Sequence, residues 1–119
     1  MAEHNELGKQ GEEAALKFLL DKGHELLKQH YRFGRAEIDI ITKEKGIIIF
    51  SEVKTRTSNR YGFPEEYITR EKIRLVKEAA EEFMYRNKYD GEVRFDVLSV
   101  TKNGETFKVH HIEDAFFHE

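Results

Sequence analysis

Apolar and polar residues follow one another along the chain in patterns that predict two helices and five strands. Over residues 5–22, apolar and small side chains recur every three or four positions, which is typical of an amphipathic helix that ends before Gly23. The same spacing predicts a second helix over residues 69–87. Segments rich in β-branched and aromatic residues predict the five strands, which read HELLKQHYRF, IDIIT, IIIFSEVK, VRFDVLSV and TFKVHHI.

The order of these elements, α-β-β-β-α-β-β, predicts a mixed sheet. The second and third strands are joined by the short segment KEKG, so we expect an antiparallel hairpin. A helix separates the third strand from the fourth, which suits a parallel crossover connection. The run GIIIF is apolar on both faces and is typical of a central strand. The predicted fold class is α/β, with a mixed central sheet flanked by helices in a single domain over residues 1–119.

Composition narrows the setting in which this chain works. The sequence has 119 residues and no cysteine, which excludes disulfides and thiolate metal sites. No apolar run approaches the ~18 residues of a membrane span, and the N-terminal segment lacks the pattern of a signal peptide. We therefore expect a cytoplasmic protein without a membrane partner. The net charge of −3 does not favour a general nucleic-acid binder.

Basic residues nevertheless gather in two segments. The first, KTRTSNR over residues 54–60, has three basic residues and no acid, and the second, REKIRLVK over residues 70–77, has four basic residues and one acid. Residues 55–67, which include most of the first segment, predict a loop that would close on a nucleic-acid backbone. A local basic patch fits a polyanion at one face, although an ordinary solvated loop and helix face carries similar charges. The candidate phosphate contacts are Arg56, Arg60, Lys72 and Arg74.

Two carboxylates meet in the predicted hairpin. Because side chains alternate along a strand, Glu37 and Asp39 share one face of the first arm, and Glu52 and Lys54 share one face of the second. A two-residue turn would place Asp39 opposite Glu52, and a four-residue turn would place Glu37 there. A turn of odd length would require a bulge. Both even registers put two carboxylates side by side at the end of a central strand.

Such a pair of carboxylates points to a divalent cation. Neighbouring carboxylates repel each other, and Mg²⁺ or Mn²⁺ relieves this repulsion through the oxygen ligands that both ions prefer. Asp39 and Glu52 are therefore the candidate metal ligands. Lys54 would orient or deprotonate an attacking water, or stabilise charge on a phosphate. A strand end with a cross-strand ion pair would show the same Glu-x-Lys spacing.

Glu12 is a further candidate. It lies on the core-facing edge of the first predicted helix, among small residues that allow close approach to the sheet. A carboxylate on that edge either contacts the metal or its water shell, or extends to solvent and pairs with Lys9 or Lys17. The histidines show no spacing typical of metal ligands, and no phosphate-binding glycine loop is present.

The candidate residues resemble a known nuclease signature. Asp39 followed by Glu52-Val53-Lys54 is similar to the PD-(D/E)xK superfamily signature, an Asp, a variable gap, and then Asp or Glu, any residue and Lys. Nearly the whole chain resembles the YraN-like family of small bacterial proteins, through the segments GKQGEEAALKFLLDKGHELL, AEIDIITKEKGIIIFSEVKTR, REKIRLVKEAAEEFM, VRFDVLSV and VHHIEDAF. The resemblance implies a restriction-endonuclease-like fold. It also implies that Glu12, Asp39, Glu52 and Lys54 are the catalytic residues.

These features together lead to a functional expectation. We expect a metal-dependent endonuclease that uses Mg²⁺ or Mn²⁺ to hydrolyse DNA, with branched or structured DNA as the substrate that Holliday-junction-resolvase relatives imply. Such relatives act as symmetric pairs, so we also consider a homodimer, in which Ile112, Phe116 and Phe117 would form an interface or would instead cap the core. The alternative is a nucleic-acid-binding or partner-docking module that has the nuclease fold but no turnover.

Overall fold

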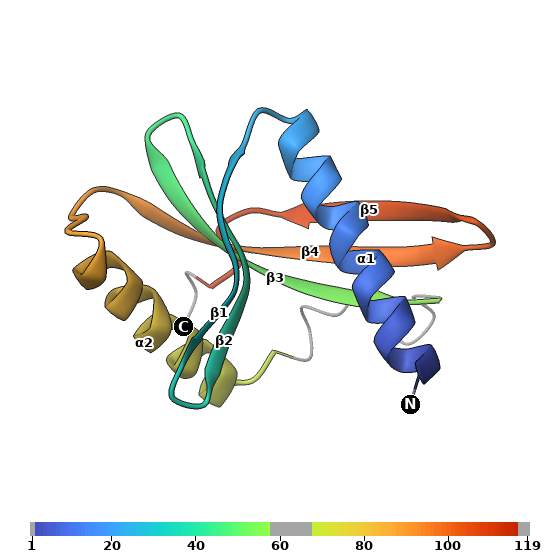
Figure 1. Ribbon diagram of the computed structural model, residues 1–119, viewed down its shortest axis with the longest axis horizontal. Coiled ribbons are helices and arrows are strands. Elements are labelled where there is room, and N and C mark those ends of the chain that lie inside the picture. The colour runs from blue at the N-terminus through green and yellow to red at the C-terminus, as the bar shows by residue number, and fades with distance from the viewer. Residues whose placement is uncertain (1, 58–67, 117–119) are drawn as a thin grey trace.

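Two helices and five strands follow one another in the predicted order (Figure 1). The computed structural model describes residues 2–57 and 68–116, except for the side chains of residues 2–5. The helices are α1 (Ala2–Asp21) and α2 (Arg70–Arg86), and the strands are β1 (Glu25–Phe33), β2 (Ala36–Glu44), β3 (Ile47–Arg56), β4 (Val93–Asn103) and β5 (Thr106–Ile112). The predicted α/β fold class is therefore confirmed, and it is consistent with a restriction-endonuclease-like fold.

All five strands form one mixed sheet in the order β1-β2-β3-β4-β5. The strand β3 is central, as its apolar sequence predicts, and it pairs in parallel with β4, whereas the other neighbours are antiparallel. It is also longer than expected, because Thr55 and Arg56 pair with Val100 and Thr101 instead of opening a loop. The rest of the predicted loop from residue 58, with Arg60, lies outside the described residues.

The hairpin between β2 and β3 has the two-residue turn. Glu44 pairs with Ile47 across Lys45 and Gly46. Both turn residues have positive φ, 54° and 81° respectively, as a type I′ turn requires. Of the two even registers that the sequence left open, this one directs Asp39, and not Glu37, toward the position opposite Glu52.

The two helices lie on opposite faces of the sheet, each over its own apolar cluster. The cluster under α2 includes Val97, and the cluster under α1 includes its neighbour Leu98, which points to the other face. The helical members of the α2 cluster are Val76, Ala79, Ala80 and Phe83, and those of the α1 cluster are Ala15 and Leu19. Within the described part of the chain, neither helix is long and apolar enough to cross a membrane.

The C-terminal turn packs back onto the α2 cluster. Phe116 is 4% exposed and belongs to that cluster, and Ile112 packs against it. Of the two roles that the sequence suggests for these residues, the structure therefore supports the capping of the core. Phe117 lies outside the described residues.

Helix α1 lies very close to β3 at Gly11. A Cβ atom added there would lie 2.0 Å from Thr55 Oγ1 and 2.7 Å from Thr55 Cβ. Only a residue without a side chain fits this contact, because real Cβ atoms do not approach other heavy atoms so closely. The contact places the next residue, Glu12, at the sheet.

We expect Gly11→Ala to lower the free energy of unfolding by about 1–3 kcal/mol, because the added methyl group overlaps the Thr55 side chain. Gly8→Ala is the matched control on the same helix. A Cβ at Gly8 meets no described atom within 4 Å, so the better helix propensity of alanine should raise stability by up to ~1 kcal/mol. Urea denaturation followed by circular dichroism measures both changes, and changes of the same sign would contradict the close approach of α1 to β3.

Candidate functional site

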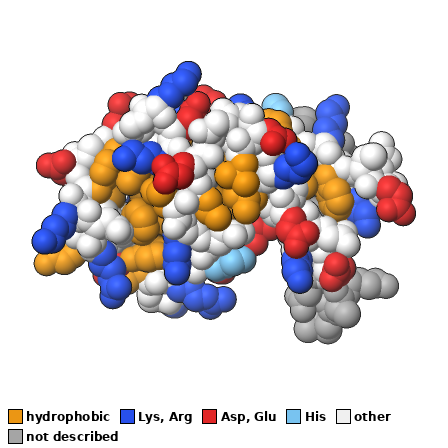
Figure 2. All heavy atoms as spheres, turned by 45° about the horizontal axis from the view of Figure 1, so that its top comes forward, with side chains coloured by type: hydrophobic (Ala, Val, Ile, Leu, Met, Phe, Trp, Pro, Cys, Tyr) orange, Lys and Arg blue, Asp and Glu red, His pale blue; other side chains and the backbone are white. Residues whose placement is uncertain are grey.

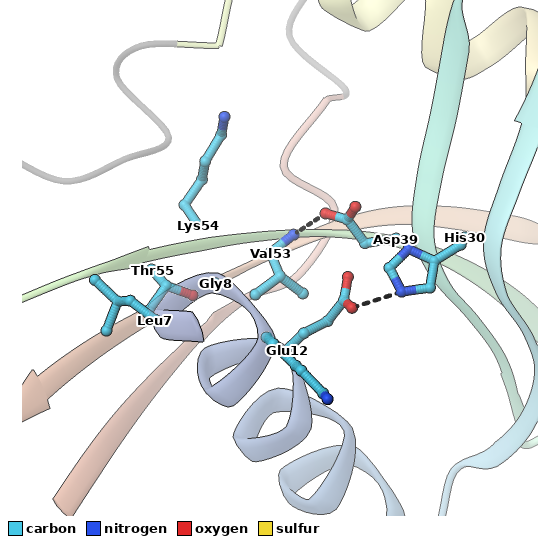
Figure 3. Close-up of a pocket in the computed structure, with 9 residues that line it drawn as sticks. Leu7, Gly8, Glu12, His30, Asp39, Val53, Lys54 and Thr55 are labelled. Carbon is cyan, nitrogen blue, oxygen red and sulfur yellow. Dashed lines mark hydrogen bonds and ion pairs between the residues drawn. The ribbon is translucent and has the colours of Figure 1, made fainter. Parts of the chain in front are cut away.

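Asp39 lies just beyond the last backbone pair of β2 with β3, and its side chain contacts β3 instead. That pairing extends from the turn to Ile40 and Ser51. Beyond it, the Val53 N–H donates a hydrogen bond of 2.8 Å to Asp39 Oδ2, where a backbone carbonyl would accept in a regular ladder (Figure 3). The Asp39 carboxylate is thereby fixed to the strand that carries Glu52 and Lys54.

The regular alternation of side chains is interrupted at this point. Ile38 belongs to the apolar cluster under α2, whereas Ile40, two residues later, belongs to the cluster under α1. In a regular strand both side chains would point to the same face. Asp39 therefore lies between the two faces of the sheet and can contact groups from either one.

On the α1 side, Asp39 meets Glu12 and His30. Glu12 Oε1 lies 2.8 Å from His30 Nε2, and one potential ligand atom from each of the three residues lies within 4.8 Å of the other two. Figure 3 shows these side chains converging from α1, β1 and β2. They line an open pocket of about 610 Å³, to which Val53 and Lys54 also contribute.

His30 is the member of this site that the sequence analysis missed. Its ring Nδ1 lies 3.1 Å from Glu37 Oε2, so the imidazole lies between two carboxylates. Its backbone has φ of 55°, in the left-handed region that residues other than glycine seldom adopt. A signal was present in the other hairpin, because pairing of Phe33 with Ala36 across a two-residue turn directs His30 toward Asp39.

On the α2 side, Asp39 meets Glu52, which is 6% exposed. Glu52 Oε2 lies 3.7 Å from Lys54 Nζ and 3.5 Å from Lys72 Nζ. Its other oxygen, Oε1, is buried and has no hydrogen-bond partner among the described residues. Buried polar atoms are nearly always paired, so an unpaired carboxylate oxygen at this position fits a cation ligand.

Burial and mutual repulsion oppose ionisation of all three carboxylates. Burial and then the Asp39 charge raise the pKa of Glu52 to about 7, although Lys72 and Lys54 act in the opposite direction. Burial first, and then the Asp39 charge, also raise the pKa of Glu12. Burial raises the pKa of Asp39 itself, against the hydrogen bond from Val53. Because the donor set is rich in oxygen and carries excess negative charge, it suits Mg²⁺ or Mn²⁺.

The four predicted catalytic residues therefore lie around one position of the sheet. Glu12, Asp39 and Lys54 line the pocket, and Glu52 contacts Lys54. Of the two positions that the sequence left open for Glu12, the structure has it directed to the site, where it pairs with His30. Of the metal-ligand pair predicted from the sequence, Asp39 lies in one group of potential ligands with Glu12 and His30, whereas Glu52 lies outside that group and contacts Lys72 on the α2 side.

The predicted phosphate-contact residues that the structure describes lie at different distances from the carboxylates of the site. Lys72, in the first turn of α2, reaches Glu52. Arg74 pairs with Glu71 at 2.8 Å and with Glu78 at 2.7 Å, both on its own helix. Arg56 lies half-buried at the end of β3. Lys72 is thus the predicted phosphate contact that the fold brings to the carboxylates.

The raised pKa of Glu52 predicts a pH dependence of stability. Its ordinary value is 4.5, so between that pH and about 7 the folded chain holds a proton that the unfolded chain has released. Stability is therefore lost as the pH rises through this range. Glu52→Gln removes the effect, and we expect this variant to gain about 2–3 kcal/mol relative to wild type between pH 5 and pH 8.

Urea denaturation at a series of pH values measures this difference. Ser51→Ala is the matched control, because Ser51 is the buried neighbour of Glu52 on β3 and cannot titrate. Its stability relative to wild type should be the same at every pH. If Glu52→Gln also shows a constant difference, Glu52 is not the titrating group.

Comparison with known proteins places the chain in a family. The pattern of the uncharacterised protein family UPF0102 matches residues 11–100. A UPF0102 protein of Flavobacterium psychrophilum is 44% identical over 118 residues, which are 99% of each chain. UPF0102 proteins of Christiangramia forsetii and Flavobacterium johnsoniae are 42% and 40% identical, again over 99% of each chain. The chain therefore belongs to UPF0102, the YraN-like family that its sequence resembles.

Proposed function

We propose that this protein is a divalent-metal-dependent endonuclease that hydrolyses phosphodiester bonds in DNA. The observation that carries the proposal is that Asp39 lies in one group with Glu12 and His30, at the pocket to which Lys54 contributes, and that the buried Glu52 contacts the same lysine. An ordinary surface ion pair does not require a buried carboxylate oxygen without a partner. A cation shared between these carboxylates and a phosphate would give that oxygen a partner.

Each residue has a chemical role in this proposal. When bound, Mg²⁺ or Mn²⁺ would neutralise charge on the carboxylates and on the phosphate. Asp39 and Glu52 would hold the ion, with Glu12 completing the oxygen ligands. Lys54 is partly exposed, its side chain at 43%, and its ammonium can donate to a phosphate oxygen or orient the attacking water. Lys72 would bring a second positive charge to the transferred phosphate.

The substrate proposal is DNA, branched DNA in particular. Lys72 and Arg56 would contact the sugar-phosphate backbone, as would Arg60 and Arg74, which remain predictions from the sequence. Resolution of a four-way junction requires two incisions. The described part of the chain forms one proposed cleavage site, the one around Asp39. A junction substrate would therefore require a homodimer, with one site on each protomer.

A second candidate function is a DNA-binding or partner-docking module without turnover. It is favoured by the charge distribution, since basic and acidic side chains are interspersed on the face that Figure 2 shows and the net charge is −3. The carboxylates at the pocket argue against it. Without a cation they would repel a phosphate, which makes them poor components of a simple binding surface.

A cleavage assay with linear, flapped and four-way-junction DNA tests the proposal. We expect cleavage in Mg²⁺ or Mn²⁺ and none in EDTA. Asp39→Asn and Lys54→Ala should each reduce the rate by about 10²–10⁴-fold. Asp39→Asn is a suitable change because the remaining amide oxygen can still accept the Val53 hydrogen bond. Lys108→Ala, on β5 at the far edge of the sheet, should cleave at the wild-type rate.

The outcomes separate the candidate functions. Cleavage that persists equally in Asp39→Asn and Lys54→Ala would come from a contaminant. Binding of DNA on every substrate without cleavage would favour the module. Calorimetric titration with Mn²⁺ adds an assay independent of DNA, and equal affinities of wild type and Asp39→Asn would contradict the assignment of Asp39 as a metal ligand.

A further inference from the structure

We infer that His30 is a direct metal ligand, and that the pocket consequently prefers a first-row transition ion such as Mn²⁺ to Mg²⁺. The inference deepens the proposed function and rests on it for the presence of a cation. To the oxygen ligands proposed above it adds one imidazole nitrogen, His30 Nε2, which lies in one group with carboxylate oxygens of Glu12 and Asp39.

The two ring nitrogens of His30 have different neighbours. Nε2 faces Glu12 Oε1 at 2.8 Å, within the group that also contains Asp39. Nδ1 faces Glu37 Oε2 at 3.1 Å. A histidine that binds a metal almost always donates its other ring N–H to a carboxylate or carbonyl, which fixes the tautomer. Glu37 occupies that position here. In the proposed metal-bound form Nδ1 would donate to Glu37, and the ion would lie between Nε2 and Glu12 in place of their present 2.8 Å contact.

The backbone of His30 is shaped to aim the ring in this direction. Pairing of β1 with β2 passes from Gln29–Ile40 to Tyr31–Ile38, and His30 between them has φ of 55°. A non-glycine residue in this region carries conformational strain, which is typical of residues held for a functional reason. The side chain is 54% exposed, so an ion and a phosphate can reach it from solvent.

Glu52 adds an observation that does not depend on His30. Its Oε1 atom is buried without a partner among the described residues, and the residue is 6% exposed. Glu52 is close enough to Asp39 for that charge to raise its pKa. Asp39 thus links the buried, incompletely paired carboxylate on one side to Glu12 and His30 on the other.

The type of donor decides which ion is preferred. Mg²⁺ favours an all-oxygen shell and binds imidazole poorly, whereas first-row transition ions accept nitrogen and oxygen together. Carboxylates alone would attract both kinds of ion through charge. An imidazole in the ligand set adds affinity for Mn²⁺ and its neighbours without adding the same affinity for Mg²⁺, so selectivity between the ions reports on His30.

The test is to titrate wild type and His30→Asn with Mn²⁺ and with Mg²⁺ by calorimetry. Asparagine tolerates a positive φ, so it keeps the backbone conformation while it removes both ring nitrogens. We expect the Mn²⁺ dissociation constant to rise by at least about tenfold, with a change of less than about threefold for Mg²⁺. His110→Asn, on β5, should change neither value.

Two further measurements distinguish ligation from loss of charge. Glu37→Gln should weaken Mn²⁺ binding by about 10–100-fold, and Mg²⁺ binding by less, because the orienting carboxylate acts on Mn²⁺ through the imidazole whereas loss of charge alone would weaken both ions equally. In wild type, Zn²⁺ should shift the Nε2 resonance of His30 in imidazole NMR spectra, with Nδ1 remaining protonated. An unchanged Mn²⁺ to Mg²⁺ affinity ratio in His30→Asn, or an unshifted Nε2 resonance, would overturn the inference and leave His30 as an ion-pair partner of Glu12.

This outcome is independent of the cleavage assay. Selective loss of Mn²⁺ affinity in His30→Asn supports the His30 ligand even if no DNA is cut, in which case only the nuclease proposal fails. Conversely, cleavage by His30→Asn with the wild-type preference between Mn²⁺ and Mg²⁺ overturns the His30 ligand and leaves the nuclease proposal in place.

Discussion

The site depends on the burial of a carboxylate at the end of the central strand. The strand β3 is covered by an apolar cluster on each face, and its run of isoleucines ends in Phe50, which is 1% exposed. Glu52 follows two residues later and is still buried. Removing an ionised carboxylate from water is unfavourable unless charges or hydrogen bonds compensate. Lys54 and Lys72 compensate for this cost through Glu52 Oε2, whereas Oε1 has no partner among the described residues. A cation at Oε1 would therefore stabilise this part of the sheet.

The fold brings three other elements to the same end of β3. The parallel connection from β3 to β4 passes through α2, and Lys72 in its first turn reaches Glu52. Helix α1 can lie close to β3 because Gly11 has no side chain to meet Thr55, and this brings Glu12 to the pocket. The hairpin partner β2 contributes Asp39. Gly11 thus positions Glu12, and the crossover helix α2 positions Lys72.

Part of this arrangement follows from local sequence signals. Hairpin geometry predicts that a carboxylate of the first arm lies opposite Glu52, and it leaves Asp39 and Glu37 open for that position. The two-residue turn at Lys45 and Gly46, with positive φ at both residues, selects Asp39. Glu12 was left undecided because its direction depends on the packing of α1 against the sheet, which no local pattern states. The charge pattern could not distinguish Lys72 from Arg74, because only the orientation of α2 decides that one reaches Glu52 and the other pairs along its own helix.

His30 was not predicted for a different physical reason. A metal ligand on a separate strand has no fixed spacing from its partners, and regular alternation does not indicate where a side chain points when its backbone adopts a left-handed conformation. Both irregular positions, His30 on β1 and Asp39 on β2, occur at the same level of the sheet. Sequence patterns describe regular strands well, and this site lies at the point where two of them depart from regularity.

In the proposed function, protons and a cation would compete for the same carboxylate oxygens. Burial and repulsion raise the pKa values of Glu12, Asp39 and Glu52, so without a cation the carboxylates retain protons to higher pH than usual. Binding of an ion requires the deprotonated forms and therefore releases protons. Ionisation of these buried carboxylates lowers the stability of the fold at neutral pH, and a cation that bound only the folded chain would restore stability. The lower stability caused by these buried carboxylates and the proposed affinity for a cation would thus have the same electrostatic origin.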